Sequence, residues 1–91
     1  MSQSIRAAHI LVSHEYEIDD LLKKLESGSK FSDLAIEFSQ CPSGKEGGDL
    51  GFFGKGQMVK PFEDSAFSLE VDEVSKAVKT QFGFHLIKRI A

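Results

Sequence analysis

The sequence predicts an α+β domain with a small, mainly antiparallel β-sheet. Apolar, strand-like segments lie near both ends of the chain, at residues 5–12 and 84–90. Two segments between them, at 15–27 and 31–39, carry apolar residues at helical spacing. With a third helix and one more short strand, the order becomes strand, helix, helix, loop, helix, strand, strand, which predicts the α+β class.

Length and composition favour one globular domain that comprises residues 1–91. The chain is 41% hydrophobic and 27% charged, and its length allows one compact core. A net charge of −3 argues against a nucleic-acid partner. No apolar run approaches the ~18 residues of a membrane span, and the N-terminus lacks the features of a signal peptide. One cysteine cannot form an internal disulfide. Together these features favour a free-standing, cytoplasmic protein, which we expect to be monomeric.

The first strand, residues 5–12, is apolar on both faces and is therefore predicted to be central in the sheet. It contains His9, which shares a face with Leu11. Burial of an imidazole costs free energy unless both ring nitrogens find partners. His9 is therefore a candidate functional residue.

Two helices are predicted next, and Gly28 is expected to end the first. Acidic residues near the start of the first helix favour its dipole. Both helices have one apolar stripe, and we expect all of its residues to pack in the core. In the first helix the stripe is Ile18, Leu21, Leu22 and Leu25, and in the second it is Phe31, Leu34, Ala35 and Phe38.

Residues 41–64 hold six of the eight glycines, both prolines and the only cysteine. We expect little regular structure there, with positive φ at the glycines. A solvated linker has no need for large apolar side chains, so we predict that this segment folds back and lines a pocket. Its large apolar residues are Leu50, Phe52, Phe53, Met58 and Phe62.

The third helix is predicted at 61–67, since proline is favoured at the first helical position. Its buried side should comprise Phe62, Ala66 and Leu69. A strand is expected near 75–78 and a turn at 81–83. In the last strand, His85 and Ile87 face one side and Leu86 the other.

If the two terminal strands pair in the middle of the sheet, His9 and His85 meet and satisfy each other, one donating and one accepting. The residues alone favour a structural pair over a catalytic one. Cys41 is either a small buried hydrophobe or, beside a histidine, a nucleophile. A zinc site from His9, Cys41 and His85 is a weaker alternative, because these positions lack a compact ligand spacing.

Six short motifs run from the first predicted strand to the last. They are HILV at 9–12, CPSG at 41–44, GGDLG at 47–51, GQMV at 56–59, KPFE at 60–63 and FGFH at 82–85. In order and spacing these motifs resemble the parvulin peptidyl-prolyl cis/trans isomerases, and above all the small free-standing bacterial members.

The resemblance implies a parvulin-like β-α-α-α-β-β domain with a four-stranded sheet, which requires a short strand around 50–53. It implies adjacent histidines, no cofactor or metal, and proline-containing polypeptides as partners. The implied catalytic residues are His9, Cys41 and His85. The implied proline pocket is Leu50, Met58 and Phe62, while Gln57 and Thr80 line or support the site and Phe82 forms part of its rim.

One departure concerns phosphate. The phosphate-directed members of the family carry a basic cluster after the first strand, but residues 13–17 read SHEYE. We therefore expect no preference for phosphorylated residues before proline. Two other functions fit the same residues: a chaperone-like module that binds extended proline-containing segments without catalysis, and a hydrolase that uses Cys41 with His9 or His85.

Overall fold

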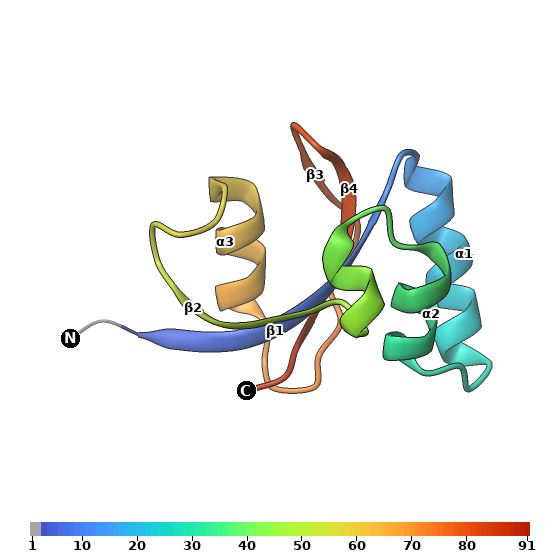
Figure 1. The fold of residues 1–91 in the computed structure, drawn as a ribbon, viewed down its shortest axis with the longest axis horizontal. Coiled ribbons are helices and arrows are strands. Elements are labelled where there is room, and N and C mark those ends of the chain that lie inside the picture. The colour runs from blue at the N-terminus through green and yellow to red at the C-terminus, as the bar shows by residue number, and fades with distance from the viewer. Residues whose placement is uncertain (1–2) are drawn as a thin grey trace.

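Four strands form one antiparallel sheet in the order β2-β1-β4-β3, so the strands from the two chain ends lie in its middle. The structure, a computed structural model, describes residues 3–91 (Figure 1). The predicted α+β class is confirmed. The elements are β1 (Ser4–Val12), α1 (Glu15–Glu26), α2 (Phe31–Phe38), the 3-10 helix η1 (Pro42–Glu46), β2 (Asp49–Gly54), α3 (Lys60–Ser68), β3 (Val78–Thr80) and β4 (Gly83–Arg89).

Each face of the sheet is covered by different helices, as Figure 1 shows, with α1 and α2 on one side and α3 on the other. We call these the α1–α2 face and the α3 face. The core of the α1–α2 face contains Ala8, Ile10, Val12, Ile18, Leu21, Phe31, Leu34, Ala35 and Leu86. The core of the α3 face contains Ile5, Ala7, Phe53, Phe62, Ala66, Leu69, Val78 and Ile87. The prediction that the first strand is covered on both sides is confirmed. Within residues 3–91, no helix has the length and apolarity needed to cross a bilayer.

The prediction that Phe38 packs in the core was wrong. Phe38 is the last residue of α2 and is 39% exposed. Its ring lies instead 5.7 Å from the ammonium group of Lys24 on α1. The helical period correctly placed the other three residues of the stripe but did not indicate where α1 stops covering α2.

The predicted strand at 75–78 was also wrong, because the observed strand β3 is Val78–Thr80. Ser75 lies beside β4 and bonds to Ile87 through both its backbone N–H and its side chain. However, only one isolated bridge, between Val74 and Lys88, forms there. The hydroxyl of Ser75 replaces a backbone partner, and this interrupts the ladder.

The glycine-rich segment contains the short strand that the resemblance required, β2, and the start of the predicted third helix, α3, together with one element that was not predicted, η1. Gly44 and Gly54 do not have the expected positive φ, although the other four glycines of the segment do. Gly48 is needed for a close approach: a Cβ there would lie 2.3 Å from the carbonyl oxygen of His9. This glycine lets the segment pack directly against β1 at the histidine.

Candidate active site

An open cleft of about 520 Å³ lies on the α3 face, and the glycine-rich segment forms much of its wall. The described residues that line it include no Asp, Glu, Lys or Arg. They are His9, Leu11, Gln40, Cys41, Pro42, Leu50, Gln57, Met58, Val59, Phe62, Phe82 and His85. Eight of the nine candidate residues therefore meet at one cleft, although they come from both ends and the middle of the chain.

The two histidines meet at the floor of this cleft. His9 on β1 and His85 on β4 place their Nδ1 atoms 2.9 Å apart, with the rings stacked at 5.1 Å. Both side chains are buried, at 5% and 4% exposure. This arrangement follows from the pairing of β1 with β4, in which Leu11 lies opposite His85 and His9 opposite Ile87. The predicted meeting of the two imidazoles is confirmed.

Hydroxyl groups at each end satisfy the outer nitrogens of the pair. Thr80 Oγ1 lies 2.7 Å from His85 Nε2, and Ser43 Oγ lies 3.2 Å from His9 Nε2. Ser43 also donates a hydrogen bond to Cys41 Sγ at 3.3 Å. The result is one continuous chain of hydrogen bonds from Thr80 to Cys41, which we call the imidazole chain.

Thr80, which was expected to line or support the site, takes the supporting position. It does not line the cleft but lies behind His85, where it also accepts the backbone N–H of Phe82 at 3.2 Å. Its place in the short strand β3, next to β4, explains this position. Thr80 supports the histidine and is not placed to touch a ligand.

Burial keeps both imidazoles neutral near pH 7. Desolvation, with a smaller contribution from His85, lowers the pKa of His9 to about 4. Desolvation also lowers the pKa of His85. The ring of Phe62 lies edge-on to both imidazoles, with centroids 5.4 Å and 5.3 Å away, and contributes to this dry environment.

The apolar wall of the cleft combines Leu50 from β2, Met58 from the β2–α3 loop and Phe62 from α3. Leu50 and Met58 pack against the core of the α3 face and remain partly exposed, whereas Phe62 is buried within it. These residues were predicted to grip a proline ring, and the structure places them together at one cleft. Direct contact with a ligand stays a prediction.

Two polar side chains hold the loop that carries Met58. Gln57 Oε1 accepts the backbone N–H of Gly54 at 2.7 Å, while the buried Glu63 accepts that of Gly56 at 2.6 Å. Gln57 lines the cleft as expected, but its carbonyl oxygen is already used. The β2–α3 loop is thus fixed at both of its glycines.

Ser43 was not among the predicted site residues, and Leu11, Gln40, Pro42 and Val59 were not predicted to line the cleft. For Leu11 a signal was available, because strand alternation already placed it on the face of His9. For Ser43 no local signal exists, since its partner His9 lies 34 positions away in the sequence. A half-buried serine in a glycine-rich loop resembles many turn residues.

A zinc site is not favoured by this geometry. The histidines direct their Nδ1 atoms at each other, and Ser43 separates His9 from Cys41. In the part of the chain that the structure describes, no group of three His, Cys, Asp or Glu side chains is arranged to hold a metal ion.

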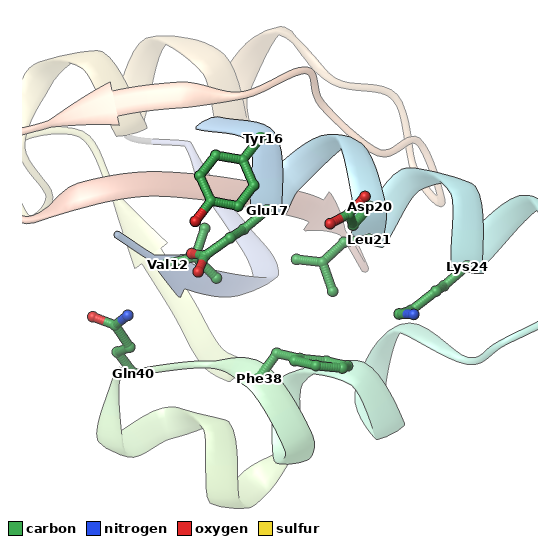
Figure 2. Close-up of a pocket in the computed structure, with 8 residues that line it drawn as sticks. All are labelled: Val12, Tyr16, Glu17, Asp20, Leu21, Lys24, Phe38 and Gln40. Atoms are coloured by element: carbon green, nitrogen blue, oxygen red, sulfur yellow. The ribbon is translucent and has the colours of Figure 1, made fainter. Parts of the chain in front are cut away.

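A second, smaller pocket of about 320 Å³ lies between α1 and the end of α2 (Figure 2). Figure 2 shows Glu17, Asp20 and Lys24 on α1, with Phe38 of α2 across from them. Gln40 lines both this pocket and the cleft. The surface next to the cleft on this side therefore carries two carboxylates and one lysine.

The sheet order, with a hydrogen-bonded histidine pair on its central strands facing an uncharged cleft, defines a parvulin-like α+β domain. The chain belongs to the family of PPIC-type peptidyl-prolyl isomerase (PPIase) domains, whose family model matches residues 1–90.

Known relatives agree with this assignment. "Foldase protein PrsA" of Geobacillus kaustophilus is 54% identical over 85 residues, which are 92% of this chain and 30% of that protein. "Peptidyl-prolyl cis-trans isomerase Pin1" of Digitalis lanata is 40% identical over a gapped alignment of 114 positions that covers 97% of this chain and 97% of that protein. The solution structure of NmPin, the parvulin of Nitrosopumilus maritimus, matches with a TM-score of 0.90 and 51% identity, over all of this chain and 99% of that one. The chain thus spans about 30% of the length of the PrsA relative but nearly all of the two smaller proteins.

Proposed function

We propose that this domain accelerates cis/trans rotation of X–Pro bonds in unfolded or partly folded polypeptides, without a covalent intermediate. One observation carries the proposal: an uncharged, largely apolar cleft lies directly against a pair of neutral, hydrogen-bonded imidazoles. Such a cleft can hold a proline ring while it disfavours charge in its neighbourhood.

The chemistry needs no bond to be made or broken. The planar amide is stabilised by resonance, which sets a barrier of about 18–20 kcal/mol to rotation. Rotation removes the resonance and moves charge from the oxygen back to the nitrogen, so the twisted amide is less polar than either planar form. A site that binds the twisted form more tightly than the planar forms lowers the barrier. Leu50, Met58 and Phe62 would hold the pyrrolidine ring while the preceding carbonyl rotates.

The position of Cys41 favours a non-covalent role. A nucleophilic cysteine needs a base within hydrogen-bonding distance. Cys41 Sγ instead accepts from Ser43, and no hydrogen bond joins it to His9 or His85 within residues 3–91. We infer that the thiol contributes to the polar side of the cleft and does not attack the substrate.

The deciding experiment is an X–Pro peptide isomerisation assay on the wild-type protein and on Cys41→Ser and Cys41→Asp, with and without thiol alkylation. Wild-type acceleration, substantial residual activity in Cys41→Ser and no release of cleaved peptide would support the proposal. Complete loss of activity in a folded Cys41→Ser variant would refute the non-covalent mechanism. Cleaved product would instead identify a hydrolase.

We further propose that the domain has no preference for phosphorylated substrates. A phosphate would need an arginine or lysine close to the cleft. The lining residues include none, and the neighbouring pocket presents Glu17 and Asp20, with its one lysine, Lys24, over the ring of Phe38. A peptide series with apolar, basic or phosphorylated residues before proline should show the phosphorylated peptides as the poorest substrates. Faster turnover of the phosphorylated peptides would contradict this.

A chaperone-like role is the second candidate, because the PrsA relative is named a foldase and the cleft is open and apolar. A module that only holds proline-containing segments would bind peptides but would not accelerate their isomerisation. Localisation in the cytoplasm and the monomeric state stay predictions from composition.

A further inference from the structure

Among the residues that line the cleft, only Gln40 and Gln57 carry a side-chain oxygen. The oxygen of Gln57 already accepts the backbone N–H of Gly54 at 2.7 Å. The side chain of Gln40 makes a hydrogen bond only through its nitrogen, and within residues 3–91 its oxygen accepts none. In the described part of the chain, Gln40 Oε1 is therefore the one side-chain oxygen of the cleft that is free to accept a hydrogen bond from a ligand.

Gln40 is held against the end of β1 by two hydrogen bonds. Its backbone N–H donates to the carbonyl of Leu11 at 2.8 Å, and its side-chain nitrogen donates to Ser13 Oγ at 2.7 Å. The amide group is thus anchored through the main chain and through the side chain. A group that is already held in place loses less conformational freedom when it binds a ligand.

The position of Gln40 directs its oxygen toward the polar side of the cleft. Gln40 lies between the cleft and the second pocket, and it directly precedes Cys41 in the chain. Figure 2 shows its amide oxygen turned away from Val12 and Phe38, which line the second pocket. The oxygen is therefore not directed into that pocket and is available at the rim of the cleft beside Cys41.

The backbone of an X–Pro segment offers a donor at the matching place. Proline has no N–H, so the nearest donor before it is the N–H of residue X. The residue before proline is biased to an extended conformation, in which its N–H and its C=O point to the same side. If the carbonyl of X faces the polar side of the cleft at Cys41, the N–H of X points to that side as well, where Gln40 lies.

We propose that Gln40 is a substrate-binding residue whose Oε1 accepts the backbone N–H of the residue before proline. This inference rests on the isomerase function proposed above and adds a contact with the main chain of the substrate. The N–H of X belongs to the peptide group that precedes the rotating one, so its charge does not change during rotation. The hydrogen bond is therefore equally strong in the planar and the twisted amide, and it contributes to KM and not to kcat.

The test uses X–Pro peptides in which an ester oxygen replaces one backbone N–H, either that of X or that of the residue after proline. For these peptides and the all-amide peptide, kcat, KM and the Kd from a binding titration are measured. The variants are Gln40→Leu, which removes the acceptor, and Gln40→Glu, whose second oxygen stays free when the first accepts the hydroxyl of Ser13. The matched control is Gln3→Leu, since Gln3 is exposed and lies outside the cleft.

We expect the ester at X to raise the wild-type KM and Kd about fivefold, with kcat unchanged, because one hydrogen bond is lost. Gln40→Leu should show the same rise with the all-amide peptide and no further rise with the ester at X. Gln40→Glu and Gln3→Leu should respond to the ester at X as the wild type does. The ester after proline should have the same effect in the wild type and in Gln40→Leu.

Equal binding of the all-amide peptide and the ester at X by the wild type would overturn the proposal. The same is true if the ester at X weakens binding equally in the wild type and in Gln40→Leu. A lower kcat with an unchanged KM in Gln40→Leu would also contradict it, because the contact would then act on rotation. Absence of isomerisation by the wild type would refute the proposed function, while the Kd values would still decide whether Gln40 binds the N–H of X.

Discussion

The two faces of the sheet use the same two central strands for different purposes. On the α1–α2 face, β1 and β4 contribute only apolar side chains to the core, such as Ile10 and Leu86. On the α3 face, Ile5, Ala7 and Ile87 pack in the same way, but the same-face positions next to Ala7 on β1 and next to Ile87 on β4 carry His9 and His85. Alternation along a strand lets one sheet contain both a closed core and an open site.

The two faces of the sheet differ in whether their buried side chains serve stability alone or also form the cleft. The α1–α2 face excludes water and has no buried ionisable group among its core residues. The α3 face contains two buried imidazoles and ends in an open cleft. We therefore expect substitutions on the first face to change stability alone, and substitutions along the cleft to change activity more than stability.

The largest effect is expected from Ile18→Ala on α1, which is fully buried in the core of the α1–α2 face. Loss of this side chain leaves a cavity and should lower the free energy of unfolding by about 3–4 kcal/mol. The kcat/KM of the folded variant should stay within about twofold of wild type, because α1 does not line the cleft. Urea unfolding and the peptide assay measure the two quantities. A large fall in kcat/KM without a fall in stability would break the comparison.

A slightly smaller effect is expected from pH, and only through the α3 face. The folded-state pKa of His9 is lowered from 6.5 to about 4, so the unfolded chain binds a proton first as the pH falls. The free energy of unfolding therefore has its full value above pH 6.5, and protonation of His9 in the unfolded chain lowers it by about 3 kcal/mol toward pH 4. Burial of His85 acts in the same direction.

Unfolding free energies at pH 7, 5.5 and 4 would measure this loss. In His9→Gln the decline across that window should be smaller by the contribution of His9. A decline in His9→Gln equal to that of the wild type would show that His9 is not the cause.

An intermediate effect is expected from Met58→Ala, at the apolar wall of the cleft. Fewer apolar contacts with the proline ring should lower kcat/KM about tenfold. The side chain is only partly buried, so the free energy of unfolding should fall by less than about 1 kcal/mol. Ile36→Ala, an exposed aliphatic residue on α2, is the control and should leave kcat/KM unchanged. If Met58→Ala lost stability and not activity, the wall would be core and not binding site.

Sequence periodicity was sufficient for the fold because three of its elements are long and regular. The stripe of α1 and the alternation of β1 and β4 correctly indicated which strands are central and which face each histidine occupies. Periodicity carries less information in short elements. The strand β3 has three residues, and its position depends on tertiary bonds such as those of Ser75.

The glycine-rich segment shows the same limit at the level of single side chains. Phe52 and Phe53 are adjacent and identical, yet Phe52 is 65% exposed and Phe53 is buried. Alternation requires this difference but does not tell which residue faces inward. The phase follows from the register of β2 against β1, which places Phe53 opposite the buried Ile5 and Phe52 opposite Arg6, and the sequence alone does not reveal this register.

The smallest effect is expected from Phe82→Ala at the rim of the cleft. Phe82 is 62% exposed, nearly as much as Phe52, but only Phe82 lines the cleft. Its backbone N–H, which donates to Thr80, is kept in the alanine variant, so the imidazole chain should stay intact. We expect kcat/KM to fall about threefold through partial loss of apolar contact, with the histidine ¹⁵N shifts unchanged. Phe52→Ala should leave kcat/KM at the wild-type value. Equal effects of the two substitutions would mean that exposed aromatic area in general, and not the cleft on the α3 face, attracts the substrate.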